Sequence, residues 1–199
     1  MTRIVAGSAR GRHLAVPSKG TRPTSDRVRE AVFSSLEAHM RAEGLSWTDI
    51  HAIDAYAGSG ALGLEALSRG AAGVVLIERS RPAADIIRRN IEAVGLPGAQ
   101  VVIGAVGAVA RQRGSQPPSW LILLDPPYDV SASLVARELA DFGASGWLTG
   151  DALAVVERPA SDATSPFPDA WNVMSQRRYG DTVVWYGRRV RAAEEDRDA

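Results

Sequence analysis

Residues 54–63, with the sequence DAYAGSGALG, carry glycines at the spacing G-x-G-x-x-G directly after a short apolar run. Glycines between a strand and a helix permit a tight turn and let a ligand approach the backbone closely. An acidic residue, Glu78, stands 24 positions after Asp54, at the end of the next apolar run. A carboxylate there can accept hydrogen bonds from both hydroxyls of a ribose. The combination favours binding of an adenosine-containing cofactor over a purely structural turn.

Asp54 also indicates which adenosine cofactor fits. A dinucleotide places its pyrophosphate against the N-terminus of the helix that follows the glycine turn. A carboxylate directly before that turn would repel the pyrophosphate. The same carboxylate suits the ammonium and sulfonium groups of S-adenosylmethionine. The sequence therefore favours a methyltransferase over an oxidoreductase with a dinucleotide cofactor.

A second motif, Asp125-Pro126-Pro127-Tyr128, follows the almost wholly apolar run 120–124. Pro127 keeps Pro126 extended, and because prolines supply no N–H, we expect both proline carbonyls to stand free as acceptors. Asp125 adds a carboxylate acceptor, and Tyr128 offers a flat face for stacking. Together these groups describe a receptor for a planar group that bears an NH2, rather than only a rigid turn at the end of a strand.

Alternating strand and helix patterns must bring the two motifs together. Apolar runs predict strands, and apolar residues at helical spacing between them predict helices. This order predicts an α/β fold: a doubly wound, seven-stranded Rossmann-like sheet with a closing antiparallel hairpin, plus a small N-terminal β-hairpin. In such a sheet the first and fourth strands meet at a switch point, where ligands bind. The predicted strands are 3–6 and 13–16 in the N-terminal hairpin and 50–55, 73–77, 100–103, 120–124, 152–156, 171–178 and 182–186 in the sheet. Five helices are predicted, three of them at 61–69, 105–113 and 131–142. A fourth begins with Thr24 or Ser25 as its cap and ends at Gly44, and a fifth has Pro82 in its first turn and ends at Gly95.

The chain has 199 residues, enough for one domain with a sizeable core. With 45% apolar and 23% charged residues, its composition is that of a globular protein. It contains no cysteine, which excludes disulfides, thiolate metal sites and a cysteine nucleophile. The three histidines lack metal-ligand spacing, so we expect no metal site, and we expect the five tryptophans in the core. The sequence shows neither a membrane-spanning run nor a signal peptide, so we expect a cytoplasmic location.

Charge is distributed unevenly, although the chain as a whole is neutral. Residues 1–29 hold seven basic residues and one acid, a net charge of +6, and residues 177–191 carry a net charge of +4. Such asymmetry indicates a polyanionic partner, with a merely solvated charged face as the alternative. We expect a basic RNA-binding hairpin at 1–20, a methyltransferase domain at 21–190 and an acidic tail at 191–199. The glycine turn and the linker suggest that removal of 1–20 would leave the sheet folded.

With these motifs in place, the chain resembles the family of 16S ribosomal RNA guanine-N2 methyltransferases. The resemblance covers residues 3 to about 187. It implies S-adenosylmethionine as cofactor and a class I methyltransferase fold. It also implies ribosomal RNA as partner, in the small subunit or an assembly intermediate. We expect the protein to be a monomer. The segments that carry it are 3–7 (RIVAG), 10–12 (RGR), 22–24 (RPT), 54–71, 125–128 and 178–182 (RYGDT).

The resemblance assigns roles residue by residue. One position departs from the family, because Ala105 follows Gly104 where an aspartate usually meets the adenine amino group. The adenine must then be recognised by backbone groups or by packing alone. The implied cofactor residues are Asp54, Ala55, Gly58, Ser59, Gly60, Glu78, Arg79 and Ala105. The residues implied to hold the guanine are Asp125, Pro126, Pro127 and Tyr128, and those implied to contact RNA are Arg3, Arg10, Arg12, Lys19 and Arg22.

The implied chemistry is direct transfer of a methyl group to an exocyclic amine. Acceptors at Asp125 and Pro126 would localise the amine lone pair toward the methyl group and stabilise the positive charge that grows on nitrogen. A base in folded RNA must leave its stack to reach such a pocket. The alternatives are a methyltransferase for DNA adenine or a protein glutamine, and a non-catalytic module that binds an adenosine cofactor. A glutamine substrate would not need the basic N-terminal segment.

Overall fold

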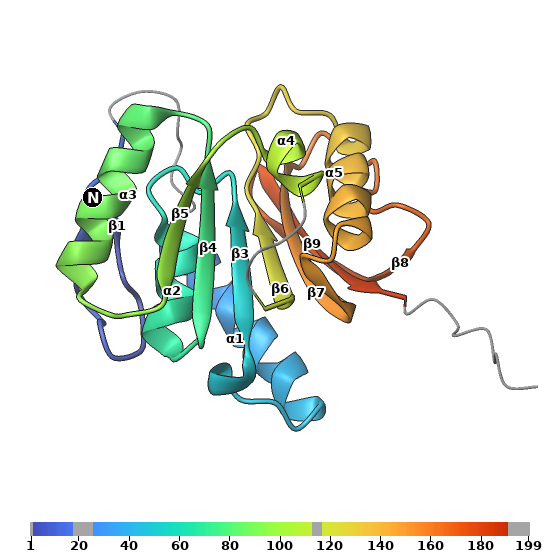
Figure 1. The fold of residues 1–199 in the computed structure, drawn as a ribbon. Coiled ribbons are helices and arrows are strands. Elements are labelled where there is room, and N and C mark those ends of the chain that lie inside the picture. The colour runs from blue at the N-terminus through green and yellow to red at the C-terminus, as the bar shows by residue number, and fades with distance from the viewer. Residues whose placement is uncertain (1, 18–25, 113–116, 191–199) are drawn as a thin grey trace, which may run out of the picture.

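A seven-stranded sheet forms the centre of the computed structural model, which describes residues 2–17, 26–112 and 117–190. Its strands are β3 (His51–Ala55), β4 (Gly73–Glu78), β5 (Ala99–Ile103), β6 (Ser119–Leu124), β7 (Leu148–Pro159), β8 (Trp171–Tyr179) and β9 (Thr182–Arg189). They lie in the order β5-β4-β3-β6-β7-β9-β8 (Figure 1). The first five strands of that order are parallel, and β9 is antiparallel to both β7 and β8. The predicted doubly wound sheet with a closing antiparallel hairpin is confirmed.

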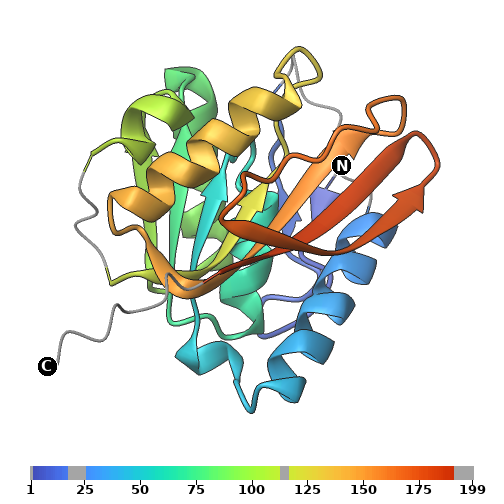
Figure 2. The same cartoon turned by 90° about the vertical axis from the view of Figure 1, so that its right-hand side faces the viewer.

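Helices cover both faces of the sheet (Figures 1 and 2). One face carries α1 (Asp26–Ala42), α2 (Ala61–Arg69) and α3 (Arg81–Val94), and the other carries α4 (Val106–Ala110) and α5 (Ala132–Ala144). A short 3-10 helix, Trp47–Asp49, precedes β3. Successive strand residues alternate between two hydrophobic clusters, so Leu123 packs on the α1 side and Leu124 on the α5 side. Because both faces are covered, the central strands read as continuous apolar runs.

Most predicted boundaries agree with the structure. α2 ends at Gly70 and α3 at Gly95, both left-handed, as the sequence predicts. The predicted strand 152–156 is too short, because β9 pairs with β7 as far as Pro159, opposite Thr182. The proposed caps at Thr24 and Ser25 lie outside the described residues, as does part of the loop before β6.

The tryptophans are core residues, as predicted. Four of them have buried side chains, and Trp47 is partly buried against the α1-side cluster, where its ring tilts against Phe33. The buried four are Trp120, Trp147, Trp171 and Trp185. They help to fill the space between sheet and helices and offer little area for base stacking.

The N-terminal hairpin is formed by β1 (Thr2–Arg3) and β2 (His13–Leu14), shorter than predicted. A compact loop lies between the two strands, closed by a hydrogen bond from Gly11 N to Ile4 O. Ile4, Ala9 and Leu14 are buried in the same cluster as α1 and α2. The hairpin therefore shares the core of the domain and is not an appendage that could be removed without exposing it.

Candidate active site

A cleft of about 880 Å³ opens where the parallel strands end. β3 and β6 pair with Ala55 opposite Leu124, so the glycine-rich turn after β3 and the segment 125–128 after β6 leave the sheet side by side. This is the predicted switch point. Of the residues predicted from the sequence, the cleft is lined by Asp54, Gly58, Ser59, Glu78, Arg79, Ala105, Asp125, Pro126, Pro127 and Tyr128.

Two predicted cofactor residues do not line the cleft. Ala55 is fully buried within β3. Gly60 begins α2 with φ 79, and a Cβ there would come within 3.0 Å of Leu76 Cδ2. Both positions therefore shape the turn and its packing, while the residues on either side of each of them line the cleft.

Glu78, at the end of β4, fastens the glycine-rich turn in place. Its Oε2 accepts a hydrogen bond from Gly58 N at 2.9 Å, and its Oε1 accepts one from Ser80 N at 2.7 Å. Gly58 has φ 56, which glycine adopts readily, whereas Tyr56 has φ 67, which is rare for a residue with a side chain. A carboxylate has about four acceptor sites, so Glu78 keeps capacity for the hydroxyls of a ribose.

Asp54 lies at the floor of the cleft and is almost completely buried. Its Oδ2 accepts a hydrogen bond from Gly63 N at 2.8 Å, which joins β3 to α2. No side chain fits at Gly63, because a Cβ would lie 2.8 Å from Val74 Cγ1 and 3.0 Å from Asp54 Cβ. Burial raises the pKa of Asp54 to about 7; the Gly63 hydrogen bond opposes this and the charge of Glu78 adds to it. A cationic ligand beside this carboxylate would favour its charged form.

The residues of the segment 125–128, which line the cleft, differ in how far they are exposed. Pro126 is buried, Asp125 is half-buried and Tyr128 is 61% exposed, so its ring is available for stacking. The expectation that both proline carbonyls stand free is wrong for Pro127, whose oxygen accepts a hydrogen bond from Val130 N at 3.0 Å. That bond closes a turn before α5. Within the described part of the chain, the Pro126 carbonyl makes no such bond.

The half-buried Tyr56 and the buried Glu138 form a pair that the sequence did not predict. Tyr56 Oη donates to Glu138 Oε2 at 2.6 Å, which connects the glycine-rich turn to α5, and both residues line the cleft. Burial raises the pKa of Glu138, and hydrogen bonds from Tyr56 and the backbone of Gly107 oppose the shift. Gly107 lies in the first turn of α4, two residues after Ala105. The pair therefore fixes three segments around one side of the cleft.

Glu157 on β7 and the β8–β9 turn also line the cleft without having been predicted to do so. The turn contributes Tyr179, Gly180, Asp181 and Thr182. The sequence signal for Glu157 is an acidic residue directly after the apolar run 152–156. Its place beside residue 125 depends on the pairing of β6 with β7, which a single strand pattern does not reveal.

Three of the five basic residues predicted to contact RNA lie on the described part of the N-terminal hairpin. Arg3, Arg10 and Arg12 are exposed; Arg3 forms an ion pair with Asp26 at 3.3 Å, and Arg12 donates to the Ala93 carbonyl. Lys19 and Arg22 lie outside the described residues. The hairpin thus presents cations to solvent at its surface while it buries apolar side chains beneath.

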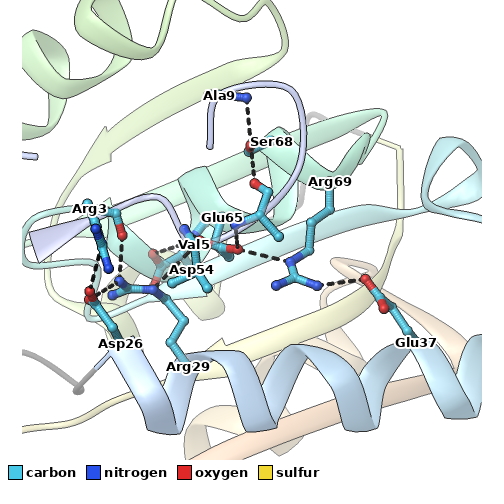
Figure 3. Close-up of polar contacts among 12 residues, drawn as sticks. Arg3, Val5, Ala9, Asp26, Arg29, Glu37, Asp54, Glu65, Ser68 and Arg69 are labelled. Atoms are coloured by element: carbon cyan, nitrogen blue, oxygen red, sulfur yellow. Dashed lines mark hydrogen bonds and ion pairs between the residues drawn. The ribbon is translucent and has the colours of Figure 1, made fainter. Parts of the chain in front are cut away.

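A buried carboxylate, Glu65 on α2, joins this hairpin to the sheet domain (Figure 3). It accepts hydrogen bonds from Val5 N at 2.7 Å and Ala6 N at 2.9 Å. It also forms ion pairs with Arg69 at 3.0 Å and Arg29 at 3.7 Å. Arg29 is itself buried and lines the cleft. One network therefore connects the hairpin, α1, α2 and the cleft wall.

Two negative findings apply to the residues that the structure describes. They contain no group of three or more histidine and acidic side chains arranged to hold a metal ion. None of their helices is long and apolar enough to cross a membrane.

Comparison with known proteins shows which family and which proteins this chain is similar to. A family model described as "Conserved hypothetical protein 95" matches residues 2–188. The protein named "Ribosomal RNA small subunit methyltransferase D" from Escherichia coli K12 is 34% identical over 197 residues, which cover 98% of this chain and 94% of that protein. The protein of the same name from Haemophilus influenzae is 32% identical and covers 89% of each chain. The solved structure of the putative methyltransferase yhhF from Escherichia coli superposes with a TM-score of 0.82 at 32% identity, covering 96% of this chain and 98% of that one.

Proposed function

This chain belongs to the family described as conserved hypothetical protein 95, and on that premise we propose that it methylates ribosomal RNA with S-adenosylmethionine as the methyl donor. The family resemblance seen in the sequence and the Rossmann-like methyltransferase fold are both confirmed. One observation carries the proposal: a single cleft joins the glycine-rich turn and Glu78 to the segment 125–128. A cofactor site and a receptor for a planar amine therefore face each other.

The residues present fit this cofactor. The cleft volume of about 880 Å³ lies within the range of small-molecule sites and leaves room for a base beside the cofactor. Glu78 offers a carboxylate for a ribose, and Asp54 offers one for a cationic amino-acid end. Ala105 and Val106 line the cleft with apolar side chains, in keeping with adenine held by packing and backbone. When bound, S-adenosylmethionine supplies an electrophilic methyl group.

The chain's own groups then orient the amine that receives the methyl group. Asp125 and the Pro126 carbonyl are acceptors for its two hydrogens, which directs the nitrogen lone pair away from the ring. The same two acceptors stabilise the positive charge that develops on nitrogen. The 61% exposed ring of Tyr128 provides a face against which the base stacks. Holding the reacting atoms about 3 Å apart supplies much of the remaining rate.

We infer further that the acceptor is the N2 amine of a guanine, as the family resemblance implies, with position 966 of 16S ribosomal RNA as the target. The exposed arginines of the hairpin support contact with RNA phosphates, with ribosomal RNA in the small subunit or an assembly intermediate as the partner. We propose that the N-terminal segment 1–20, whose described part shares the core of the domain, binds the RNA and that residues 21–190 carry out the catalysis. We also propose that the protein works as a monomer in the cytoplasm, as we expect from its sequence.

Nucleoside mass spectrometry of ribosomal RNA from cells with and without the gene tests the proposal. Loss of N2-methylguanosine from small-subunit RNA in the deletion strain, restored by the wild-type gene, is the expected result. Purified protein should also transfer labelled methyl groups to small subunits from that strain. Loss of a methylated adenine in DNA, or of a methylated glutamine in a protein, would instead support one of the two alternative substrates.

A further inference from the structure

Asp125 and Glu157 occupy matching positions at the ends of two neighbouring strands. β6 and β7 are parallel, with Leu123 opposite Val155 and Leu124 opposite Val156. The next position in this register brings Asp125 beside Glu157, and neighbouring strands lie only about 4.8 Å apart. Both residues line the cleft. A carboxylate from each strand is therefore present at the same end of the site.

The two side chains also belong to the same face of the sheet. Side chains two positions apart on a strand point to the same side. Leu123 and Val155 both pack in the cluster beneath α1 and α2, so Asp125 and Glu157 follow them on that side. Val184, which pairs with Glu157 from β9, packs in the same cluster. Glu157 therefore directly follows the residue that pairs with Leu124, and its own pairing with Val184 holds its backbone in the sheet.

One carboxylate and one carbonyl are sufficient for an exocyclic amine. An amine of the NH2 type offers two hydrogens, and Asp125 and the Pro126 carbonyl are two acceptors. A carboxylate accepts hydrogen bonds at about four sites, so Glu157, which also interacts within the protein, can accept one more from a donor on the same edge of the base. Guanine has such a donor, because its N1–H stands next to its 2-amino group. Adenine has an unprotonated N1 next to its amino group, and that nitrogen would face the carboxylate lone pairs.

We propose that Glu157 accepts the N1–H of the target base and thereby selects guanine over bases whose N1 is an acceptor. The inference rests on the proposed function and deepens it, since it assigns the base specificity to a residue outside the 125–128 motif. Enzymes that turn a base out of its stack read it through its Watson–Crick edge. Glu157 and Asp125 together match the donors on the Watson–Crick edge of guanine, and Tyr128 contributes stacking without base preference.

Two RNA substrates distinguish recognition of the N1–H from recognition of the 2-amino group. Target RNA is made by ligation with either guanine or 2-aminopurine at the methylated position; 2-aminopurine keeps the 2-amino group but has an unprotonated N1. Wild-type protein should methylate the guanine substrate on the order of 10- to 100-fold faster, the effect of a hydrogen bond to a charged group. In Glu157→Gln the side-chain amide can accept from N1–H or donate to an unprotonated N1. In this variant the ratio of the guanine rate to the 2-aminopurine rate should fall by about tenfold or more, mainly because 2-aminopurine reacts faster relative to guanine.

Asp151→Asn serves as the matched control, because Asp151 lies on the same strand but is exposed and outside the cleft. Asp151→Asn should keep the wild-type ratio of guanine to 2-aminopurine methylation and the wild-type rate on guanine. Binding of S-adenosylhomocysteine by Glu157→Gln, measured by calorimetry, checks that the variant is folded. If wild-type protein methylates guanine and Glu157→Gln keeps the wild-type ratio, the role of Glu157 is refuted while the proposed function stands. If wild-type protein methylates neither RNA nor small subunits, the proposed function itself fails.

Discussion

Glu65 accepts a hydrogen bond from the backbone N–H of Val5 at 2.7 Å, a contact that ties α2 to the N-terminal hairpin (Figure 3). Glu65 is completely buried, and it lies only two residues after Gly63, whose N–H holds Asp54 at the floor of the cleft. The same helix thus anchors the hairpin on one side and the cleft on the other. The position of the exposed arginines relative to the cleft is fixed by this helix.

Replacement of Glu65 should therefore be costly. In Glu65→Ala the cations of Arg29 and Arg69 lose their buried partner, and two backbone N–H groups lose their acceptor. Removal of one partner of a buried ion pair destabilises a protein by about 3–5 kcal/mol. We expect a loss of that size in the free energy of unfolding, measured with urea. Asp85→Ala, which breaks an exposed pair with Arg88, should change it by less than about 1 kcal/mol; equal effects would contradict the anchoring role.

The proposed role of the hairpin in RNA binding is better tested by removing one charge than by deleting the hairpin, since deletion would remove the buried Ile4 and Leu14. Arg10 is exposed on the hairpin loop. Arg10→Ala should weaken binding of ribosomal RNA and lower the log–log slope of affinity against salt by roughly 0.7–0.9, the value for one phosphate contact. Binding of S-adenosylhomocysteine should not change. Arg41→Ala, at the C-terminal end of α1, is the matched control and should keep the wild-type slope.

The motifs at 54–63 and 125–128 were predictable because each follows an apolar run and their chemistry is local in sequence. It was also predictable that the two motifs lie side by side, because the strand order of a doubly wound sheet places them together. Glu65 could not be found in this way, because a charged residue in a helix normally indicates a solvent-facing position. Only the packing of the hairpin over α2 buries it and supplies its partners.

The other residues that the sequence did not reveal depend on contacts between distant segments. Glu157 reaches the cleft through the register of β6 and β7, although it lies 32 positions after Asp125 in the sequence. Tyr56 meets Glu138 across 82 positions, where α5 packs against the turn after β3. The hydrogen bond from Val130 N to the Pro127 carbonyl forms in the turn that leads into α5. The Pro-Pro sequence alone does not determine the geometry of that turn.

Glu78 should control cofactor affinity in two ways, because it holds the Gly58 turn and faces the cleft. Glu78→Ala should weaken binding of S-adenosylhomocysteine by about 1.5–3 kcal/mol, the range for hydrogen bonds to a charged group. Glu78→Gln retains one acceptor oxygen and should lose less. Isothermal titration calorimetry measures both variants. A folded Glu78→Ala protein with wild-type affinity would exclude Glu78 from the cofactor site.

Asp54 should make stability depend on pH. Its pKa is raised from 3.8 to about 7 in the folded protein, so between these values the folded state holds a proton that the unfolded state has released. Stability contributed by this group therefore falls as pH rises from about 4 to 7 and is constant above that. Asp54→Asn removes the titration and keeps an oxygen for Gly63 N. Its stability relative to wild type, measured by urea unfolding, should increase between pH 5 and pH 8 by on the order of 2–3 kcal/mol; a difference that is independent of pH would contradict the raised pKa.

Asp125 should act on the chemical step and not on cofactor binding. In Asp125→Ala the amine loses one oriented acceptor and the growing charge on nitrogen loses its nearest carboxylate. Loss of one such group typically costs about 10²-fold or more in rate, so single-turnover methyl transfer should fall by that order, while affinity for S-adenosylhomocysteine changes little. Asp125→Asn keeps a neutral acceptor and should fall between wild type and alanine, because hydrogen bonds to a charged acceptor are roughly twice as strong as neutral ones. If the alanine variant binds the cofactor normally and still turns over near the wild-type rate, Asp125 is not an acceptor for the amine and the Pro126 carbonyl must orient it alone.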